Sequence, residues 1–316
     1  APPWSSLKGG DTILLQAGER ESIQFNNLSG SEKKYIVIIN KVGTTEIKST
    51  KLPYGISLRN CHYIKLTSTG DAKSKFGIKI SEVIPEGAGI GISDKSDNIE
   101  IANVEVSNTK GPGILCKTNP DCNTSAKNFT AHDFSIHHNY VHHTGTEGLY
   151  IGSTAVEGEE IICDGIKKNI LPPVLQNVQV FSNRVEYTGW DGIQISNSKN
   201  VLCYNNSVSY DSQKQMEWQN CGLMIGGGTN GKFYNNTILY GKGYAINCFG
   251  YTEVEISNNI IAMDSDNDKV AIYASDKLVN EKTLVRIDSN HITTKYFPAI
   301  KISNKNSAVK FEVEDN

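Results

Sequence analysis

A short motif recurs along this chain: a small residue, then two apolar residues separated by one variable residue. Such a repeat, with uninterrupted spacings of roughly 22 to 28 residues, is typical of solenoids, in which each repeat buries its apolar face against the next. The alternation within each copy predicts a short β-strand with its apolar side chains inside. The copies are Gly55-Ile56-Ser57-Leu58, Gly77-Ile78-Lys79-Ile80, Gly89-Ile90-Gly91-Ile92, Gly113-Ile114-Leu115-Cys116, Gly148-Leu149-Tyr150-Ile151, Gly192-Ile193-Gln194-Ile195, Gly222-Leu223-Met224-Ile225, Ala245-Ile246-Asn247-Cys248, Ala271-Ile272-Tyr273-Ala274 and Ala299-Ile300-Lys301-Ile302.

A second signature follows most of these copies, and it places an asparagine between two apolar segments. Because Asn tolerates a left-handed backbone, we expect it to form the bend between two strands. Stacked on successive coils, the Asn amides would hydrogen-bond to one another as an asparagine ladder. The residues in question are Asn139, Asn183, Asn206, Asn236, Asn259 and Asn290.

Together the two signatures predict an all-β chain: a single-stranded, right-handed parallel β-helix of about ten coils, each with three short strands. A solenoid supplies the crossover connections that parallel strands require. No segment of ten or more residues keeps the period of an α-helix. We therefore expect one domain over residues 1–316, a rod on the order of 50 Å long at the usual strand spacing.

The opening segment Leu7-Lys8-Gly9-Gly10-Asp11-Thr12-Ile13-Leu14-Leu15, followed by Gly18, adds a resemblance to this pattern. It is similar to the start of β-helix proteins of the alginate lyase and chondroitinase B type, with Gly9 in place of a proline. The chain as a whole resembles the pectate-lyase-like superfamily, which implies an exported polysaccharide-degrading protein. That superfamily also contains hydrolases, epimerases and non-enzymatic surface proteins, so the resemblance specifies fold more strongly than chemistry.

Charge narrows the range of partners. Lys and Arg number 31 against 34 Asp and Glu, a net charge of -3, which leaves no basic excess for nucleic acid or an anionic membrane. No apolar run approaches the length of a membrane-spanning helix. We expect a monomer that binds a polysaccharide or oligosaccharide and is secreted, periplasmic or on the cell surface, its signal peptide having been removed.

The seven cysteines are an odd number with no C-x-x-C pair, which argues against a zinc site. Most are expected to be buried thiols. Cys116 and Cys122 lie close together in a polar stretch and could bridge each other or Cys163. Either bridge would imply an oxidising compartment.

Three insertions interrupt the repeat on the central coils, at about residues 117–133, 153–176 and 211–220. Insertions of this length in a solenoid are more often functional than decorative. All three are expected to flank the outer face of the first strand of the coil, the Gly-apolar-x-apolar strand, and to form the walls of a groove there.

The residues on the groove floor can be predicted from the register of neighbouring coils. The segments Val141–Gly148 and Val185–Gly192 have equal length, so Glu147 is expected about 5 Å from Asp191 on the next coil. Such a pair could perform acid/base catalysis, as glycoside hydrolysis requires, or hold Ca²⁺ as a cofactor. The alternative is a pair of solvated turn residues. His143 and Tyr150 are the candidate bases.

Substrate binding is assigned to polar and aromatic residues around this pair. Aromatic faces suit the C–H surfaces of sugars, although Trp and Tyr are also ordinary strand residues. The candidates are Trp190, Gln194, Tyr187, Tyr210 and Trp218.

The expected function is an exported enzyme that cleaves a polysaccharide in this groove, as a glycoside hydrolase or a polysaccharide lyase. The resembling lyases place Lys and Arg on this face, and the first-strand positions of the coils at Gly148, Gly192 and Gly222 carry none. That departure favours the hydrolase. The alternative is a non-catalytic glycan-binding or structural surface protein.

Overall fold

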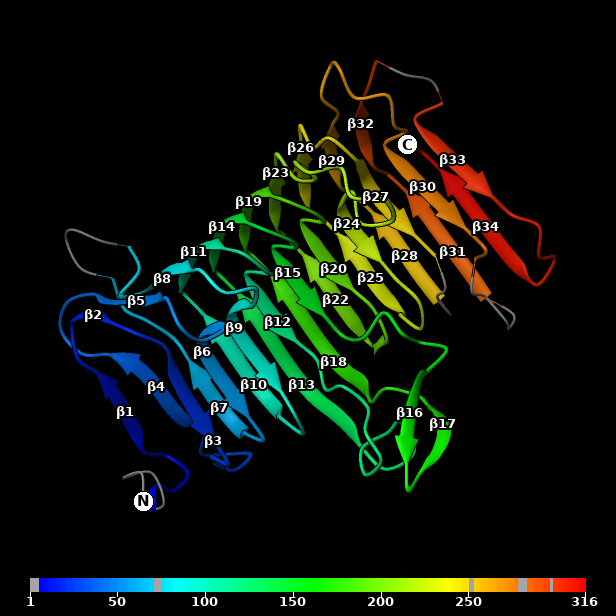
Figure 1. The fold of residues 1–316 in the computed structure, drawn as a ribbon. Coiled ribbons are helices and arrows are strands. Elements are labelled where there is room, and N and C mark those ends of the chain that lie inside the picture. The colour runs from blue at the N-terminus through cyan, green and yellow to red at the C-terminus, as the bar shows by residue number, and fades with distance from the viewer. Residues whose placement is uncertain (1–5, 71–74, 250–252, 278–282, 296–297) are drawn as a thin grey trace.

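The computed structural model describes residues 6–70, 75–249, 253–277, 283–295 and 298–316. Within these ranges the chain winds into a parallel β-helix whose coils contribute strands to three long parallel sheets, named A, B and C here (Figure 1). The described part contains no α-helix and so no helix able to cross a membrane. The predicted all-β solenoid is therefore confirmed.

Sheet A is 12-stranded, and its strands are neighbours in chain order, with β21 pairing beside β18. Its strands are β1 (Thr12–Leu15), β4 (Ile36–Asn40), β7 (His62–Leu66), β10 (Asp97–Ala102), β13 (Thr130–His137), β18 (Val174–Phe181), β21 (Ser198–Lys199), β22 (Val201–Tyr204), β25 (Gly231–Tyr234), β28 (Glu253–Ser257), β31 (Thr283–Asp288) and β34 (Val309–Glu314).

Sheets B and C are each 10-stranded. Sheet B contains β2 (Gly18–Arg20), β5 (Thr45–Ser49), β8 (Ile78–Val83), β11 (Glu105–Thr109), β14 (Tyr140–Thr144), β19 (Arg184–Thr188), β23 (Ser207–Ser209), β26 (Thr237–Leu239), β29 (Ile260–Ala262) and β32 (His291–Thr293). Sheet C contains β3 (Ile23–Asn26), β6 (Tyr54–Arg59), β9 (Ala88–Ser93), β12 (Ile114–Cys116), β15 (Leu149–Ile151), β20 (Ile193–Ile195), β24 (Cys221–Ile225), β27 (Tyr244–Cys248), β30 (Ile272–Ser275) and β33 (Ile300–Ser303).

The predicted first strands form sheet C with one exception. Leu149 pairs with Ile193, and Ile193 with Leu223, as equal spacing predicts. The copy at Gly77–Ile80 instead leads into β8 of sheet B. Its assignment to the first strand was wrong, because an alternating apolar pattern fits any strand that faces the interior.

The core is a set of stacked aliphatic columns. Along sheet C one column runs through Ile114, Leu149, Ile193, Leu223 and Ile246, each at most 1% exposed. Burial of each such side chain contributes roughly 1.5–3 kcal/mol. Because the columns run the length of the solenoid, they fix the register of every coil.

The small residue of the motif has a steric cause. A Cβ added to Gly148 would lie 2.3 Å from Cγ1 of Val185 and 2.6 Å from the carbonyl oxygen of Gly192. The same contact recurs between Gly113 and Val141 at 2.3 Å. The corner between sheets B and C is therefore too tight for larger residues on these coils.

The asparagine ladder is present at the turn between sheets A and B. The Nδ2 of Asn183 donates to the Oδ1 of Asn206 at 3.0 Å, and Asn206 donates to Asn236 at 2.9 Å. The expected left-handed conformation belongs to the preceding residue instead: Asn205 has φ of 54°. The ladder asparagine supplies hydrogen bonds, and its predecessor makes the bend.

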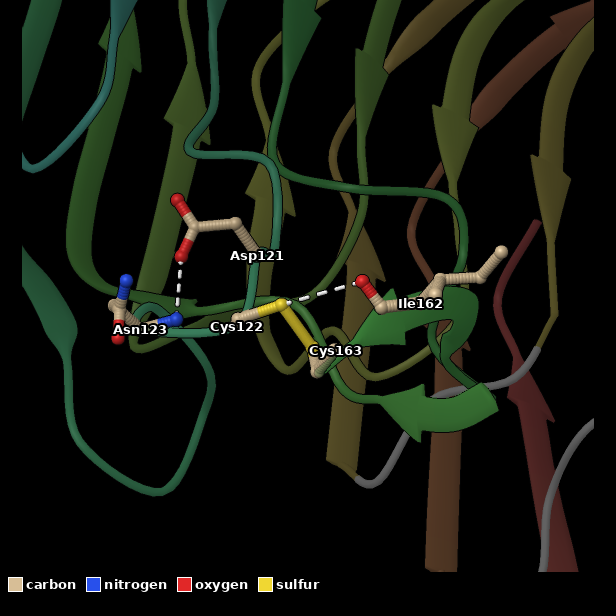
Figure 2. The surroundings of a disulfide bond; sticks show 5 residues. All are labelled: Asp121, Cys122, Asn123, Ile162 and Cys163. Atoms are coloured by element: carbon tan, nitrogen blue, oxygen red, sulfur yellow. Dashed lines mark hydrogen bonds between the residues drawn. A yellow bond between two sulfur atoms is a disulfide. The ribbon is translucent and has the colours of Figure 1, made fainter. Parts of the chain in front are cut away.

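Two insertions are joined covalently. The predicted insertion at 153–176 contains a short antiparallel hairpin of β16 (Glu159–Cys163) and β17 (Ile166–Ile170) that projects from the solenoid (Figure 1). Its last residues, from Val174 onward, already belong to β18 of sheet A. A disulfide connects Cys163 to Cys122 in the preceding insertion (Figure 2). Of the pairings considered, this is the one formed, and Cys116 is a buried free thiol.

Candidate active site

A surface pocket of about 410 Å³ lies at the corner where the chain passes from sheet B to sheet C. Successive coils contribute the same corner position. The backbone N–H of Thr146 donates to the carbonyl oxygen of Gly111, and that of Trp190 to Thr146. The pocket therefore extends along the solenoid axis. It is lined by Glu86, Gly87, Lys110, Gly111, Pro112, Leu115, Lys117, Thr146, Glu147, Tyr150, Trp190, Lys214 and Gln219.

Glu147 is the buried acid of this pocket. The residue is 1% exposed, and its Oε1 has no hydrogen-bond partner among the described residues. Burial raises the pKa of the carboxyl, and the charge of Lys117 partly opposes that shift. A carboxyl whose pKa is raised by burial beside a pocket is suited to general acid catalysis.

Asp191 is the predicted neighbour of Glu147, as the hydrogen bond from Gly148 N–H to the Asp191 carbonyl confirms. Its side chain, however, does not line the pocket. Asp191 is fully buried, and its Oδ1 accepts hydrogen bonds from the backbone N–H and the thiol of Cys221, at 2.9 and 3.2 Å. Burial raises its pKa well above the usual value, and the nearby Glu147 and Asp211 add to the shift.

These surroundings fit a calcium ion poorly. Ca²⁺ takes six to eight oxygen ligands, several of them ionised carboxylates. Here the Oδ1 of Asp191 already accepts hydrogen bonds from Cys221. Burial also raises the pKa of both acids, which disfavours the ionised forms that Ca²⁺ requires. Among the described residues, no three His, Cys, Asp or Glu side chains are grouped so as to hold a metal ion. We therefore assign Glu147 and Asp191 no metal.

Tyr150 lies on the floor of the pocket, on the outer side of β15. Its hydroxyl is 3.1 Å from Oγ1 of Thr154, the second residue of the hairpin insertion. The Nζ of Lys117 lies 5.0 Å from the centre of the Tyr150 ring. A phenol and a cation thus share one end of the pocket with Glu147.

Sequence reasoning missed three lysines, Lys110, Lys117 and Lys214. The first two flank β12, one coil before Glu147, and Lys214 comes from the 211–220 insertion. The Nζ of Lys214 donates to the carbonyl oxygen of Gly145 at 2.7 Å, which anchors the insertion at the pocket edge. The absence of cations from the strands at Gly148, Gly192 and Gly222 was read correctly. Lys110 and Lys117 were detectable as a pair flanking the preceding copy of the motif.

The predicted groove floor is closed one coil beyond Tyr150. Gln194 alternates with the core residues Ile193 and Ile195, so it lies on the outer side of the strand, yet it is 1% exposed. Met224 on the following coil is 3% exposed. Other parts of the chain therefore cover these positions. Gln194 does not line the pocket.

Among the predicted binding aromatics, the structure places Trp190 in the pocket. Trp218 does not line the pocket and is 68% exposed. The Nζ of Lys277 lies 4.4 Å from its ring centre. His143, Tyr187 and Tyr210 do not line the pocket. Their rings stack on one another along sheet B, with centres 4.9 Å apart. Stacked rings cover each other's faces, so the faces of Tyr187 and Tyr210 are not open to a sugar as we expected. His143, expected as a candidate base, lies outside the pocket.

The insertions contribute unequally. The 211–220 insertion supplies Lys214 and Gln219, and the 117–133 insertion supplies Lys117. The 153–176 insertion supplies no lining residue, although Thr154 contacts Tyr150. A Cβ added to Gly227 would lie 2.7 Å from Cγ2 of Val156, so this insertion packs over a later coil.

A protein-family model described as "Right handed beta helix region" matches residues 136–316, more than half of the chain. The chain belongs to this family. The strand order of the three sheets, with parallel pairing throughout, likewise builds a parallel β-helix. No curated protein sequence matches this β-helix protein.

Solved structures share the fold at low sequence identity. An alginate lyase from Paenibacillus sp. str. FPU-7 aligns over 97% of this β-helix chain and 94% of its own, with 15% identity and a TM-score of 0.64. The pectate lyase Pel9A aligns over 97% and 72%, with 12% identity and a TM-score of 0.59. A lacto-N-biosidase from Eubacterium ramulus aligns over 97% and 63%, with 12% identity and a TM-score of 0.57. The β-helix chain thus spans less than two thirds of the biosidase.

Proposed function

We propose that this protein is a carbohydrate-active enzyme, a lyase that cleaves a uronate-containing polysaccharide at the corner pocket. The observation that carries the proposal is the convergence of three lysines with Tyr150 and the buried Glu147 in one pocket. Three ammonium groups suit an anionic sugar. The fold shared with an alginate lyase and a pectate lyase supports the reaction class.

The reaction is a β-elimination. A base removes the proton on the ring carbon that bears the uronate carboxylate. The electrons of that C–H bond form a C=C double bond, the adjacent glycosidic C–O bond breaks, and the departing oxygen takes a proton. The step requires cations to stabilise the charge that develops on the carboxylate, a base and an acid.

The pocket offers a group for each requirement. Lys110, Lys117 and Lys214 would bind and neutralise the uronate carboxylate. Tyr150 would act as the base that takes the proton, with the Lys117 Nζ 5.0 Å from its ring centre. Glu147, whose raised pKa favours the protonated form, would donate to the leaving oxygen.

A hydrolase is the second candidate, because Glu86 lines the same pocket as Glu147. Glycoside hydrolysis requires two carboxyls that face the same bound sugar, and Asp191 does not line the pocket. Glu86, not the enclosed Asp191, would be the partner of Glu147. Glu147 and Asp191 therefore do not form the catalytic dyad that the sequence predicted.

We also place the enzyme outside the cytoplasm. The support is the disulfide Cys122–Cys163, since structural disulfides persist in oxidising compartments.

The test uses alginate, pectate and a neutral glucan as substrates. Reducing ends and the ultraviolet absorbance of unsaturated sugars should rise together on an acidic polymer. Tyr150→Phe, which keeps the ring, should abolish the rise. Tyr273→Phe is the matched control. The register of sheet C connects Tyr150 through Gln194, Met224 and Asn247 to Tyr273, which therefore occupies the same strand position on a later coil. Reducing ends without absorbance would identify a hydrolase, and binding without either signal would identify a glycan-binding protein.

A further inference from the structure

Four aromatic residues occupy the same position on four successive coils of sheet B: His143, Tyr187, Tyr210 and Tyr240. The register places them in one column, hereafter the tyrosine column. The ring centres of His143 and Tyr187, and of Tyr187 and Tyr210, are 4.9 Å apart, and those of Tyr210 and Tyr240 are 6.0 Å apart.

The backbone of the column is unusual for aromatic residues. The φ angles are 53°, 52°, 55° and 57° in chain order, all in the left-handed region. Asn108 holds this position one coil earlier with φ of 52°, and most other left-handed positions in the chain carry Asn, Asp or Ser. Bulky residues are strained there, and such strain concentrates at functional positions.

The column is also exposed. Tyr187, Tyr210 and Tyr240 are 41%, 37% and 43% exposed. A second stack, of Phe181, Tyr204 and Tyr234 on sheet A, has similar ring spacings of 5.0 and 5.2 Å but is half-buried. Because stacking covers the ring faces of the tyrosine column, its solvent-facing part consists of ring edges.

The column borders the candidate active site. His143 and Tyr187 come three residues before Thr146 and Trp190, which line the pocket, so column and pocket are at most about 11 Å apart along the chain. The 211–220 insertion contacts both: Gln213 Nε2 donates to the carbonyl oxygen of Tyr210 at 2.9 Å, and Lys214 Nζ to that of Gly145 at 2.7 Å.

We propose that the tyrosine column is a secondary carbohydrate-binding strip that holds a polysaccharide chain beside the pocket. The proposal rests on the proposed function, because it takes the occupant to be a glycan. A row of phenol groups, repeated once per coil, presents its exposed ring edges to solvent and offers hydrogen bonds to sugar hydroxyls. At the far end the next coil carries Met263 in place of a ring, so one face of Tyr240 is not covered by the stack.

The test measures binding apart from cleavage. In a Glu147→Gln background, retention in affinity electrophoresis would be measured with alginate, pectate and a neutral glucan in the gel. Replacing Tyr187, Tyr210 and Tyr240 together with Asn, the residue that Asn108 shows to fit this backbone, should weaken retention by at least about tenfold in Kd. The control is Tyr204→Leu with Tyr234→Leu in the sheet A stack, which should leave retention unchanged. A triple Tyr→Phe variant keeps the rings and removes only hydroxyls, and it should weaken retention by a smaller factor.

Two outcomes separate this proposal from the enzymatic one. With Glu147 restored, the triple Asn variant should cleave a short oligosaccharide like the wild type and cleave the polymer more slowly. If the triple Asn substitution abolishes retention while the wild type cleaves none of the polysaccharides, the strip is supported and the enzymatic function is overturned. Unchanged retention in the triple Asn and triple Phe variants, or no retention of the parent protein, would overturn the strip.

Discussion

Glu147 and Asp191 occupy the same position on neighbouring coils, yet only Glu147 lines the pocket. The two acids are therefore expected to differ in function. Glu147→Gln should lower turnover by a factor on the order of 10² or more, as for loss of a general acid. Asp191→Asn should leave turnover within about tenfold of the wild type and act mainly on stability, since its partner is the buried Cys221. Steady-state kinetics and thermal melts of both variants check this. Equal loss of turnover in the two variants would restore the paired-carboxylate mechanism.

The pocket lysines should contribute to substrate binding as well as to the chemical step. Lys110→Gln and Lys117→Gln are each expected to raise KM for an acidic polysaccharide by about tenfold, because a hydrogen bond to a charged group contributes roughly 1.5–3 kcal/mol. The effect should shrink as salt is added. Lys167→Gln, in the exposed pair with Glu160 on the hairpin, is the control. A KM that does not respond to either pocket substitution would exclude an anionic substrate at this site.

Asp211 should make stability depend on pH. Burial raises its pKa from the usual 3.8 of an aspartate to about 7. Its folded-state pKa lies above the unfolded one, so its contribution is fully present below about pH 4 and is lost as pH rises to about 7. Asp211→Asn cannot ionise, and its melting temperature should fall less between pH 5 and 8. The exposed Asp268→Asn should follow the wild type. Identical pH profiles for Asp211→Asn and the wild type would show that Asp211 is not protonated in the folded protein.

The asparagine ladder should be a main source of stability. Asn206 donates to the carbonyl oxygen of Val180 and to Asn236, and accepts from the backbone and side chain of Asn183. Asn206→Ala would leave several buried groups unpaired, at a cost of about 3 kcal/mol or more. The neighbouring Asn205→Gly should be nearly neutral, since glycine accepts the left-handed backbone. Denaturant unfolding compares the two, and a small effect of Asn206→Ala would mean that water replaces the ladder.

The repetitive part of the fold was predictable because each coil repeats the same packing requirement. The apolar residues at Leu149, Ile193 and Leu223 align in the structure as their spacing predicts. The same register correctly made Glu147 and Asp191 neighbours. The ladder asparagines were also found, although the left-handed bend lies one residue earlier, as at Asn205.

The candidate site was less predictable because it depends on segments that do not repeat. Burial of Gln194 and Asp191 depends on what lies over and beside them, and the coil period carries no information on that. Lys214 reaches the pocket from an insertion whose path has no counterpart on other coils. Tyr187 and Tyr210 have the composition of a sugar-binding surface, but their left-handed backbone and mutual stacking emerge from the three-dimensional register.

The tight corner at Gly113, Gly148 and Gly192 bears on how proteins of this shape diversify. A larger residue at these glycines would displace the adjacent valine or the backbone of the next coil. Amino-acid substitutions at these glycines should therefore be selected against. The residues immediately before them, Pro112, Glu147 and Asp191, vary from coil to coil in this chain. New specificities would accordingly arise by exchange at that one position per coil and by growth of the adjoining loops, while the cross-section stays the same.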